Sequence, residues 1–254
     1  MALEYFIQFP CKVREQVAQE DLLAMLKAQG RYQAIVDVQQ KSMPEGKNIG
    51  DSKIVLIQRG PNGDEKVEVK LSELAGQAAP LKQLATICEN CPANLRQAEF
   101  GCGGTLHYPI SLRAEEWLIS RLPDDLTSNQ GKMLLAALKD FNFDGAPIDR
   151  LRSSRSLFQS DKPCQRKWGG FLSKKTIINS SQVLQMLMHV GHLSPSHAKL
   201  AAYFVGFVDD QFRYTDARQT KDQPNDAPGV IGLKAFLRAV GFAGANNLPV
   251  FIEA

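Results

Sequence analysis

Residues Lys53–Leu71 read KIVLIQRGPNGDEKVEVKL, and this stretch is the clearest local indication of the fold. Two runs rich in β-branched residues, Lys53–Gln58 and Lys66–Leu71, flank the segment Gly60–Asp64. The Asn62-Gly63 pair within that segment is the strongest short-range signal for a tight turn between antiparallel strands. The sequence therefore predicts a β-hairpin.

Outward from this hairpin, residues 1–110 show a mixed pattern of strands and helices. Alternating or aromatic runs predict strands, and apolar residues at helical spacing predict helices, with Pro80 as a break in the second helix. The predicted strands are Leu3–Pro10, Tyr32–Val38 and Thr105–Ile110, and the predicted helices are Val13–Gln29 and Ser72–Ile87.

From Ser111 onward the pattern becomes mainly helical. Ser111 can cap a helix over Leu112–Arg121, with acidic residues in its first turns, where the helix dipole favours them. Further helices are predicted over Gly131–Phe141, Ile148–Gln159, Ser181–Val190, Pro195–Val208 and Gly232–Val240, with a polar loop over Arg213–Pro228. We expect an α+β protein: a mixed α/β domain over residues 1–110 with a small antiparallel hairpin and a Cys-rich metal knuckle, then a mainly α-helical domain over residues 111–254.

Composition places the chain among soluble globular proteins. It has 254 residues, of which 44% are hydrophobic and 22% charged, so disordered, collagen-like and coiled-coil classes are excluded. The longest apolar run, Leu200–Val208, is far short of the ~20 residues that span a bilayer. The first residues carry no cationic n-region, and the five cysteines are unevenly spaced. We therefore expect a cytoplasmic protein with no membrane partner.

A group of cysteines follows the second predicted helix. Cys88 and Cys91 have C-x2-C spacing, Cys102 lies between glycines ten residues further on, and His107 follows. A C-x2-C turn brings two sulfur atoms to one point, and three thiolates with one imidazole form a closed tetrahedral zinc site. We expect structural zinc bound by Cys88, Cys91, Cys102 and His107.

Other interpretations of these cysteines remain open. The Cys91-Pro92 pair also ends many iron–sulfur motifs, so the three cysteines with Cys11 or Cys164 could hold an iron–sulfur cluster. Cys102 could instead be a nucleophile with His107 as its base. The thiols could also be buried and idle, since cysteine is among the most buried residue types.

A basic segment covers residues 150–175. It contains eight cations and the single anion Asp161, a net charge of +7 in a chain of net charge +3, so the rest of the chain carries −4. Phe158, Trp168 and Phe171 lie among the cations, a composition that suits phosphate contacts and base stacking. The residues expected to bind a polyanion are Arg150, Arg152, Arg155, Arg166, Lys167 and Trp168. A solvated loop is the alternative interpretation.

Three weaker patterns favour ordinary structure. Asp140–Gly145 matches part of a calcium loop, but Leu151 replaces the bidentate Glu of the twelfth position, so a turn is favoured. Ser181–Val208 has the spacing of a helix-turn-helix, but its second helix is too apolar to read bases, so we expect a buried αα-hairpin. His189, His192 and His197 lie near that connection, where turn and cap roles are favoured over a metal site.

Common catalytic and nucleotide-binding motifs are missing from the sequence. It has no G-x4-G-K-[ST], G-x-G-x-x-G, H-E-x-x-H or G-x-S-x-G pattern. We therefore expect a binding or adaptor protein whose partner is nucleic acid or an acidic protein. An enzyme that uses Cys102, or a metal centre at the three cysteines, is the second hypothesis.

Overall fold

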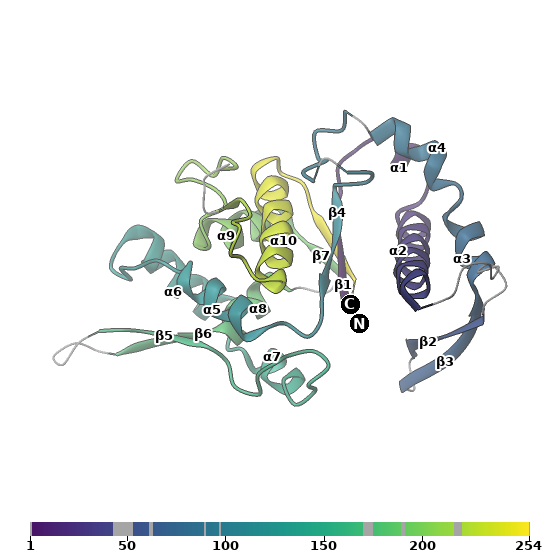
Figure 1. Cartoon of the computed structure of the whole chain (residues 1–254). Helices are drawn as coiled ribbons and strands as arrows, with labels where there is room; N and C mark the ends of the chain where they lie inside the picture. The colour runs from purple at the N-terminus through teal and green to yellow at the C-terminus, as the bar shows by residue number, and fades with distance from the viewer. Residues whose placement is uncertain are drawn as a thin grey trace. The chain divides into compact units, whose positions relative to one another are not determined.

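The computed structural model describes residues 2–42, 53–60, 63–88, 90–96, 98–169, 175–188, 191–215 and 220–253. The chain forms two compact units, Pro10–Cys91 and a larger unit made of Met1–Phe9 and Pro92–Ala254. The bounds of these units differ from those of the expected domains 1–110 and 111–254. The first strand of the chain and the residues from Pro92 onward belong to the larger unit (Figure 1). The coarse expectation of a mixed α+β protein with antiparallel sheets is confirmed.

The unit Pro10–Cys91 contains the predicted hairpin. Strands β2 (Lys53–Gly60) and β3 (Gly63–Lys70) pair antiparallel down to Gly60 and Gly63, while Pro61 and Asn62 of the predicted turn lie outside the described residues. The other elements of the unit are α1 (Lys12–Gln16), α2 (Gln19–Ser42), α3 (Leu71–Ala78), α4 (Leu81–Ala85) and the 3-10 turn η2 (Thr86–Cys88). The interruption expected at Pro80 separates α3 from α4.

The strand predicted over Tyr32–Val38 is wrong, because these residues continue helix α2. Tyr32, Ile35 and Val36 follow Ala28 at helical spacing and pack with it against α3. Their β-branched and aromatic side chains suggested a strand locally. Burial of one helical face against another element outweighs that propensity.

The larger unit is built on a four-stranded antiparallel sheet. Its strand order is β4 (Gly103–His107), β1 (Ala2–Ile7), β8 (Val250–Glu253) and β7 (Gly191–Leu193). The two ends of the chain therefore pair in the middle of the sheet, with Glu4 opposite Glu253. Alternation along β1 directs Leu3, Tyr5 and Ile7 to one face.

Helix α10 (Pro228–Ala245) packs on that face of the sheet, against β4, β1 and β8, and α9 (Pro195–Phe204) packs against α10 (Figure 1). The ring of Phe236 meets that of Tyr5 with centroids 5.1 Å apart. A Cβ at Gly244 would lie 2.6 Å from the backbone nitrogen of Lys199, so only glycine allows α9 this close. Among the described helices, α10 alone has the length and hydropathy of a membrane-crossing helix, but more than half of it is buried inside the unit, as in a core helix.

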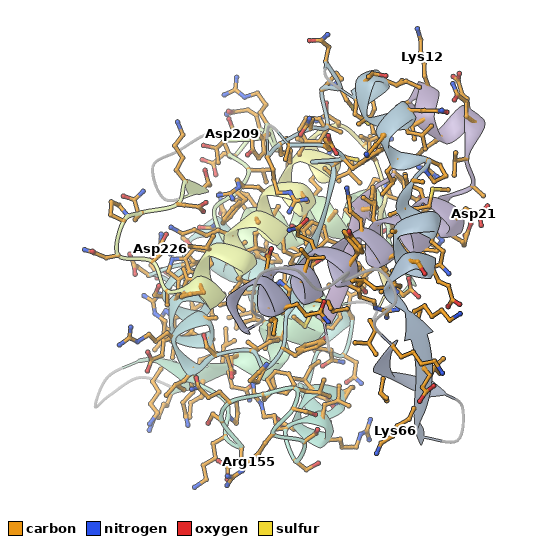
Figure 2. The ribbon with its side chains drawn as sticks, turned by 45° about the vertical axis from the view of Figure 1, so that its right-hand side comes forward. Lys12, Asp21, Lys66, Arg155, Asp209 and Asp226 are labelled. Carbon is orange, nitrogen blue, oxygen red and sulfur yellow. The ribbon has the colours of Figure 1, made fainter. Side chains whose placement is uncertain are left out.

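Helix α10 also fixes the loop that precedes it. Lys234 is buried, donates to Asp226 at 2.6 Å and to the carbonyl of Lys221 at 2.8 Å, and lies 5.6 Å from the ring centre of Trp117. One turn further, Arg238 pairs with Asp222 at 2.9 Å. The described residues of the predicted polar loop from Lys221 to Asp226 are therefore held against the helix, with Asp226 near the end of the loop (Figure 2).

The larger unit contains further helices and strands, which follow β4 in the sequence. They are α5 (Leu112–Ser120), α6 (Asn129–Asp140), α7 (Ala146–Leu151), β5 (Gln165–Trp168), β6 (Thr176–Asn179) and α8 (Ser180–Leu187). Ser111 caps α5 as expected, accepting from the backbone of Ala114. The helix expected over Ile148–Gln159 is wrong beyond Leu151, because Phe158 forms a β-bridge with Ile110.

Candidate functional site

The predicted metal knuckle is not supported. Cys88 and Cys91 belong to the unit Pro10–Cys91, whereas Cys102 and His107 belong to the larger unit. Among the residues that the structure describes, no group of three or more His, Cys, Asp or Glu side chains lies close enough to hold a metal ion. The expected zinc site and its iron–sulfur alternative therefore have no described ligand cluster.

The local geometry around Cys102 also argues against pairing it with His107. Cys102 directly precedes β4 and His107 ends it, so His107 lies five residue steps along extended chain from Cys102. At about 3.3 Å per residue the two backbones lie roughly 16 Å apart, beyond the reach of one metal ion or of a nucleophile and its base. His107 is exposed at the end of the strand, whereas Cys102 is half-buried.

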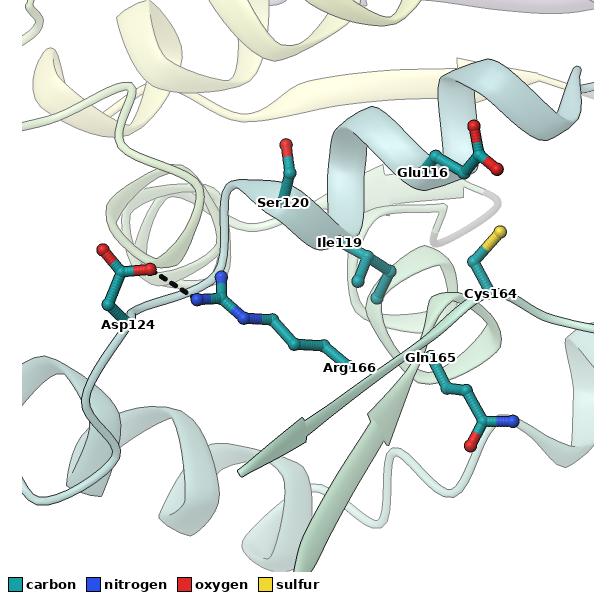
Figure 3. Close-up of a pocket in the computed structure, with 7 residues that line it drawn as sticks. All are labelled: Glu116, Ile119, Ser120, Asp124, Cys164, Gln165 and Arg166. Carbon is teal, nitrogen blue, oxygen red and sulfur yellow. Dashed lines mark hydrogen bonds and ion pairs between the residues drawn. The ribbon is translucent and has the colours of Figure 1, made fainter. Parts of the chain in front are cut away.

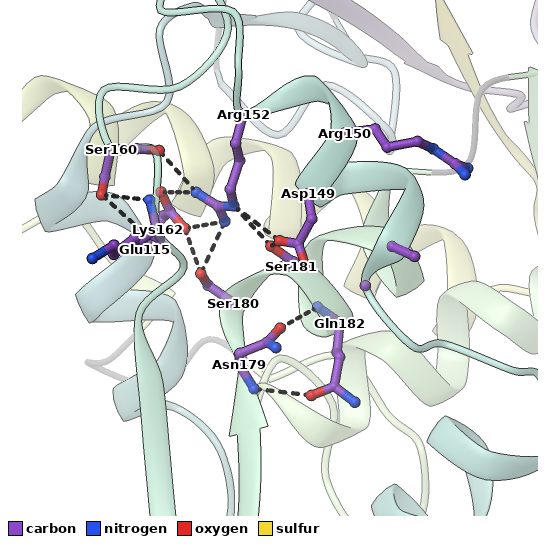
Figure 4. A network of polar contacts seen from close by, with 12 residues as sticks. Glu115, Asp149, Arg150, Arg152, Ser160, Lys162, Asn179, Ser180, Ser181 and Gln182 are labelled. Atoms are coloured by element: carbon purple, nitrogen blue, oxygen red, sulfur yellow. Dashed lines mark hydrogen bonds and ion pairs between the residues drawn. The ribbon is translucent and has the colours of Figure 1, made fainter.

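The basic segment begins with a buried ion pair rather than a free surface. Arg152, 2% exposed, donates to both carboxylate oxygens of Glu115, at 3.0 and 2.5 Å. The same guanidinium also donates to the hydroxyls of Ser181 and Ser180, at 2.8 and 3.1 Å (Figure 4). It lies 4.5 Å from the ring centre of Phe158. Arg152, one of the expected polyanion ligands, is therefore a core residue that ties α7 to α5 and α8.

Arg166 and Trp168 also serve the fold. They share one face of β5, because side chains alternate along a strand. Arg166 donates to the carbonyl of Leu122 at 2.7 Å and forms an ion pair with Asp124. The indole nitrogen of Trp168 donates to the carbonyl of Pro123 at 3.1 Å, and the guanidinium of Arg166 lies 5.0 Å from its ring centre. Both side chains brace the turn after α5, and they belong to a strand rather than to a solvated loop.

The other cations of the segment are exposed. Arg150 points away from the buried network on the same helix (Figure 4), and Arg155 extends from the loop after α7 (Figure 2). Five exposed cations in the described residues take no part in an ion pair: Arg150, Arg155, Lys162, Lys167 and Lys175. Phe171 and Lys174 lie outside the described residues, so the part expected of them stays untested.

A cavity of about 420 Å³ lies between α5 and the start of β5. Sequence reasoning missed it: Cys164 drew attention only as a spare cluster ligand, and no local pattern links it to α5. Figure 3 shows Cys164 beside Glu116 at one end and the Asp124–Arg166 ion pair at the other. The lining residues are Glu116, Ile119, Ser120, Asp124, Cys164, Gln165 and Arg166.

The electrostatics of this cavity are negative around the thiol. Burial raises the pKa of Cys164 above its ordinary value, and the charges of Glu115 and Glu116 raise it further, while Arg152 lowers it. The thiol is therefore protonated at neutral pH, and Cys164 is a poor nucleophile. A carboxylate on the wall suits a cationic group better than an anionic one.

The weaker sequence patterns take structural roles. In the Asp140–Gly145 turn, Asp144 accepts from the backbone of Ala146, and Gly145 has a φ of 84°, which favours glycine. The αα-hairpin expected over Ser181–Val208 is wrong, because strand β7 joins the sheet between the two helices.

The histidines near that connection are dispersed. His192 lies on β7 and His197 on α9, where its ring contacts Phe143 with centroids 5.5 Å apart. His189 lies outside the described residues.

Comparison of the chain with protein-family models, with curated proteins and with solved structures finds no match.

Proposed function

We propose that this protein is a binding protein whose partner is a polyanion, held by the exposed cations of residues 150–175. One observation carries the proposal. Five of the eight cations in this segment are exposed and unpaired among the described residues, and Asp161 is the segment's single anion. Exposed cations without a counter-ion attract phosphate or carboxylate groups by charge.

The structure changes how such a partner would be recognised. Trp168 is half-buried, its N–H is bonded to the backbone, and Arg166 covers its ring. Base stacking on Trp168 therefore drops out of the proposal. What remains is recognition by charge through flexible Lys and Arg side chains, with little sequence preference.

The two strands of the β5–β6 hairpin make this proposal testable. Lys167 lies directly opposite Ile177, so both side chains lie on the face turned away from Arg166 and Trp168. Ile177 is 46% exposed, which makes that face accessible. Lys175 directly precedes β6. Lys167 and Lys175 can be replaced without touching the contacts of Arg166.

The test is fluorescence anisotropy with a labelled oligothymidylate at several salt concentrations. We expect weak binding whose log–log salt slope is about −0.7 for each phosphate contact. Lys167→Ala with Lys175→Ala should flatten the slope by about 1–1.5. A matched control, Lys132→Ala with Lys139→Ala, removes the same charge from the exposed face of α6 and should leave the slope unchanged.

Two results would overturn the proposal: no binding at low salt, or equal weakening by both double variants. An acidic peptide of similar charge density distinguishes the partner classes. Tighter binding of this peptide than of the oligonucleotide at equal salt assigns the surface to an acidic protein.

A further inference from the structure

The cavity between α5 and β5 has a rigid wall at Cys164. The backbone nitrogen of Cys164 donates to the hydroxyl of Ser180 at 3.0 Å, and the backbone nitrogen of Ser180 donates to the carbonyl of Cys164 at 2.8 Å. Ser180 is fully buried and belongs to the network around Arg152. Cys164 is therefore held in place by the core, and its half-buried thiol lines a pocket of about 420 Å³ that is largely open to solvent.

The cavity is rich in hydrogen-bond acceptors. Glu116 is exposed and takes part in no ion pair within the described ranges. Arg166, the one cation on the wall, is neutralised by Asp124, so the lining has a net charge of −1. Ile119 supplies apolar surface between the two ends, as Figure 3 shows.

We propose that this cavity binds a small organic cation, an alkylammonium or alkylguanidinium group on an aliphatic stem, with the carboxylate of Glu116 as its counter-ion. The charged head reaches Glu116 beside Cys164, and the stem packs on Ile119. Burial and the charge of Glu115 raise the pKa of the Cys164 thiol, and the charge of Glu116 raises it further, as expected for a carboxylate close to the thiol. This site is independent of the polyanion surface.

The thiol of Cys164 provides a reporter inside the site. Two methanethiosulfonate reagents, one carrying trimethylammonium and one carrying sulfonate, form the same kind of mixed disulfide with a thiolate and differ mainly in charge. The rates of modification of Cys164 by the two reagents are followed by peptide mass spectrometry at low salt. Both rates are proportional to the thiolate fraction, so their ratio does not depend on that fraction and reports the local electrostatic field. A simple thiol in solution gives the reference ratio.

We expect the rate ratio at Cys164 to favour the cationic reagent over the reference. Glu116→Gln should lower the ratio by about tenfold, because one unit charge close to the thiol acts with opposite sign on the two reagents. Glu99→Gln, an exposed carboxylate outside the cavity lining, is the matched control and should leave the ratio unchanged. A ratio that is the same in Glu116→Gln and the unsubstituted protein would overturn the proposal.

Ligand binding is tested with the same readout. Agmatine or a blocked arginine peptide should lower the ratio in the unsubstituted protein towards the Glu116→Gln value and should have no effect in Glu116→Gln. Potassium chloride at equal ionic strength corrects for screening. If the change in the rate ratio saturates with agmatine, the site is assigned to a free amine. If it saturates with the peptide alone, the site is assigned to a side chain of a partner protein. No shift beyond the salt control with either probe would overturn the proposal.

Discussion

Replacing Arg152 with alanine should be among the most damaging substitutions in the larger unit. The guanidinium is 2% exposed and donates to Glu115, Ser180, Ser181 and the backbone carbonyl of Ser160. Glu115 is fully buried, so the substitution leaves its carboxylate in the core without a counter-charge. Breaking a buried ion pair in this way costs about 3–5 kcal/mol. For a unit of this size the midpoint of thermal unfolding should fall by roughly 6–20 °C.

The assay is urea unfolding followed by tryptophan fluorescence. Both tryptophans, Trp117 and Trp168, lie in the larger unit, so the signal reports on the unit that contains the network. Arg150→Ala is the matched control, because Arg150 is exposed on the same helix and points away from the network (Figure 4). Its effect should stay within about 0.5 kcal/mol.

A second variant separates the ion pair from the loss of packing. Arg152→Met combined with Glu115→Gln removes both charges and keeps most of the volume, so it should cost clearly less than Arg152→Ala alone. A cost below about 1 kcal/mol for Arg152→Ala would refute the reasoning, as would a cost equal to that of Arg150→Ala. Either result would mean that the buried pair does not hold α5, α7 and α8 together.

Four further substitutions test other parts of the structure. Asp226→Asn should cost about 3–5 kcal/mol of the free energy of unfolding at pH 7, because it leaves Lys234 buried without its anion. Burial would raise the pKa of Asp226, but hydrogen bonds from Lys234 and from a backbone N–H, together with the Lys234 charge, lower it. In urea titrations the stability difference between the two proteins should therefore persist at neutral pH and shrink below about pH 4. Gly145→Ala should lower the thermal midpoint, since φ is 84° there and a Cβ would meet a neighbouring Cβ at 3.0 Å, whereas Gly76→Ala in the open face of α3 should raise stability by up to about 1 kcal/mol. Cys91→Ser should change the free energy of unfolding by less than about 1 kcal/mol and leave metal content unchanged, and loss of bound zinc on that substitution would reinstate the knuckle.

Local patterns predicted the elements whose structure depends on near neighbours. The β2–β3 hairpin follows from two runs rich in β-branched residues that flank the Asn62-Gly63 pair, and the cap at Ser111 follows from one hydroxyl before a helix. Strand β8 was missed because Val250–Glu253 is four residues long and is defined by its pairing with β1 at the other end of the chain. Nothing within the last residues reports that partner.

The candidate site shows the same division between local and distant information. A count of charges cannot distinguish Arg150 from Arg152, two residues apart in one cluster. Their difference arises from Glu115, which lies 37 residues earlier in the sequence and meets Arg152 only in the folded unit. Likewise, the sequence of β5 is simply polar and basic. Only its pairing with Thr176–Asn179 makes it a strand, in which alternate side chains lie on opposite faces.

This alternation assigns opposite electrostatic roles to neighbouring residues of the β5–β6 hairpin. Lys167 lies on the face proposed to meet a polyanion, whereas Arg166 lies on the other face, where Asp124 neutralises it beside the cavity. Replacing Arg166 and Lys167 together would therefore mix a loss of stability with a loss of surface charge. Single variants keep the two apart: Lys167→Ala should weaken polyanion binding without lowering stability, and Arg166→Ala should lower stability because the turn after α5 loses its brace. If Arg166→Ala leaves the unfolding midpoint unchanged and weakens binding as much as Lys167→Ala does, both cations belong to one surface and the assignment of faces is wrong.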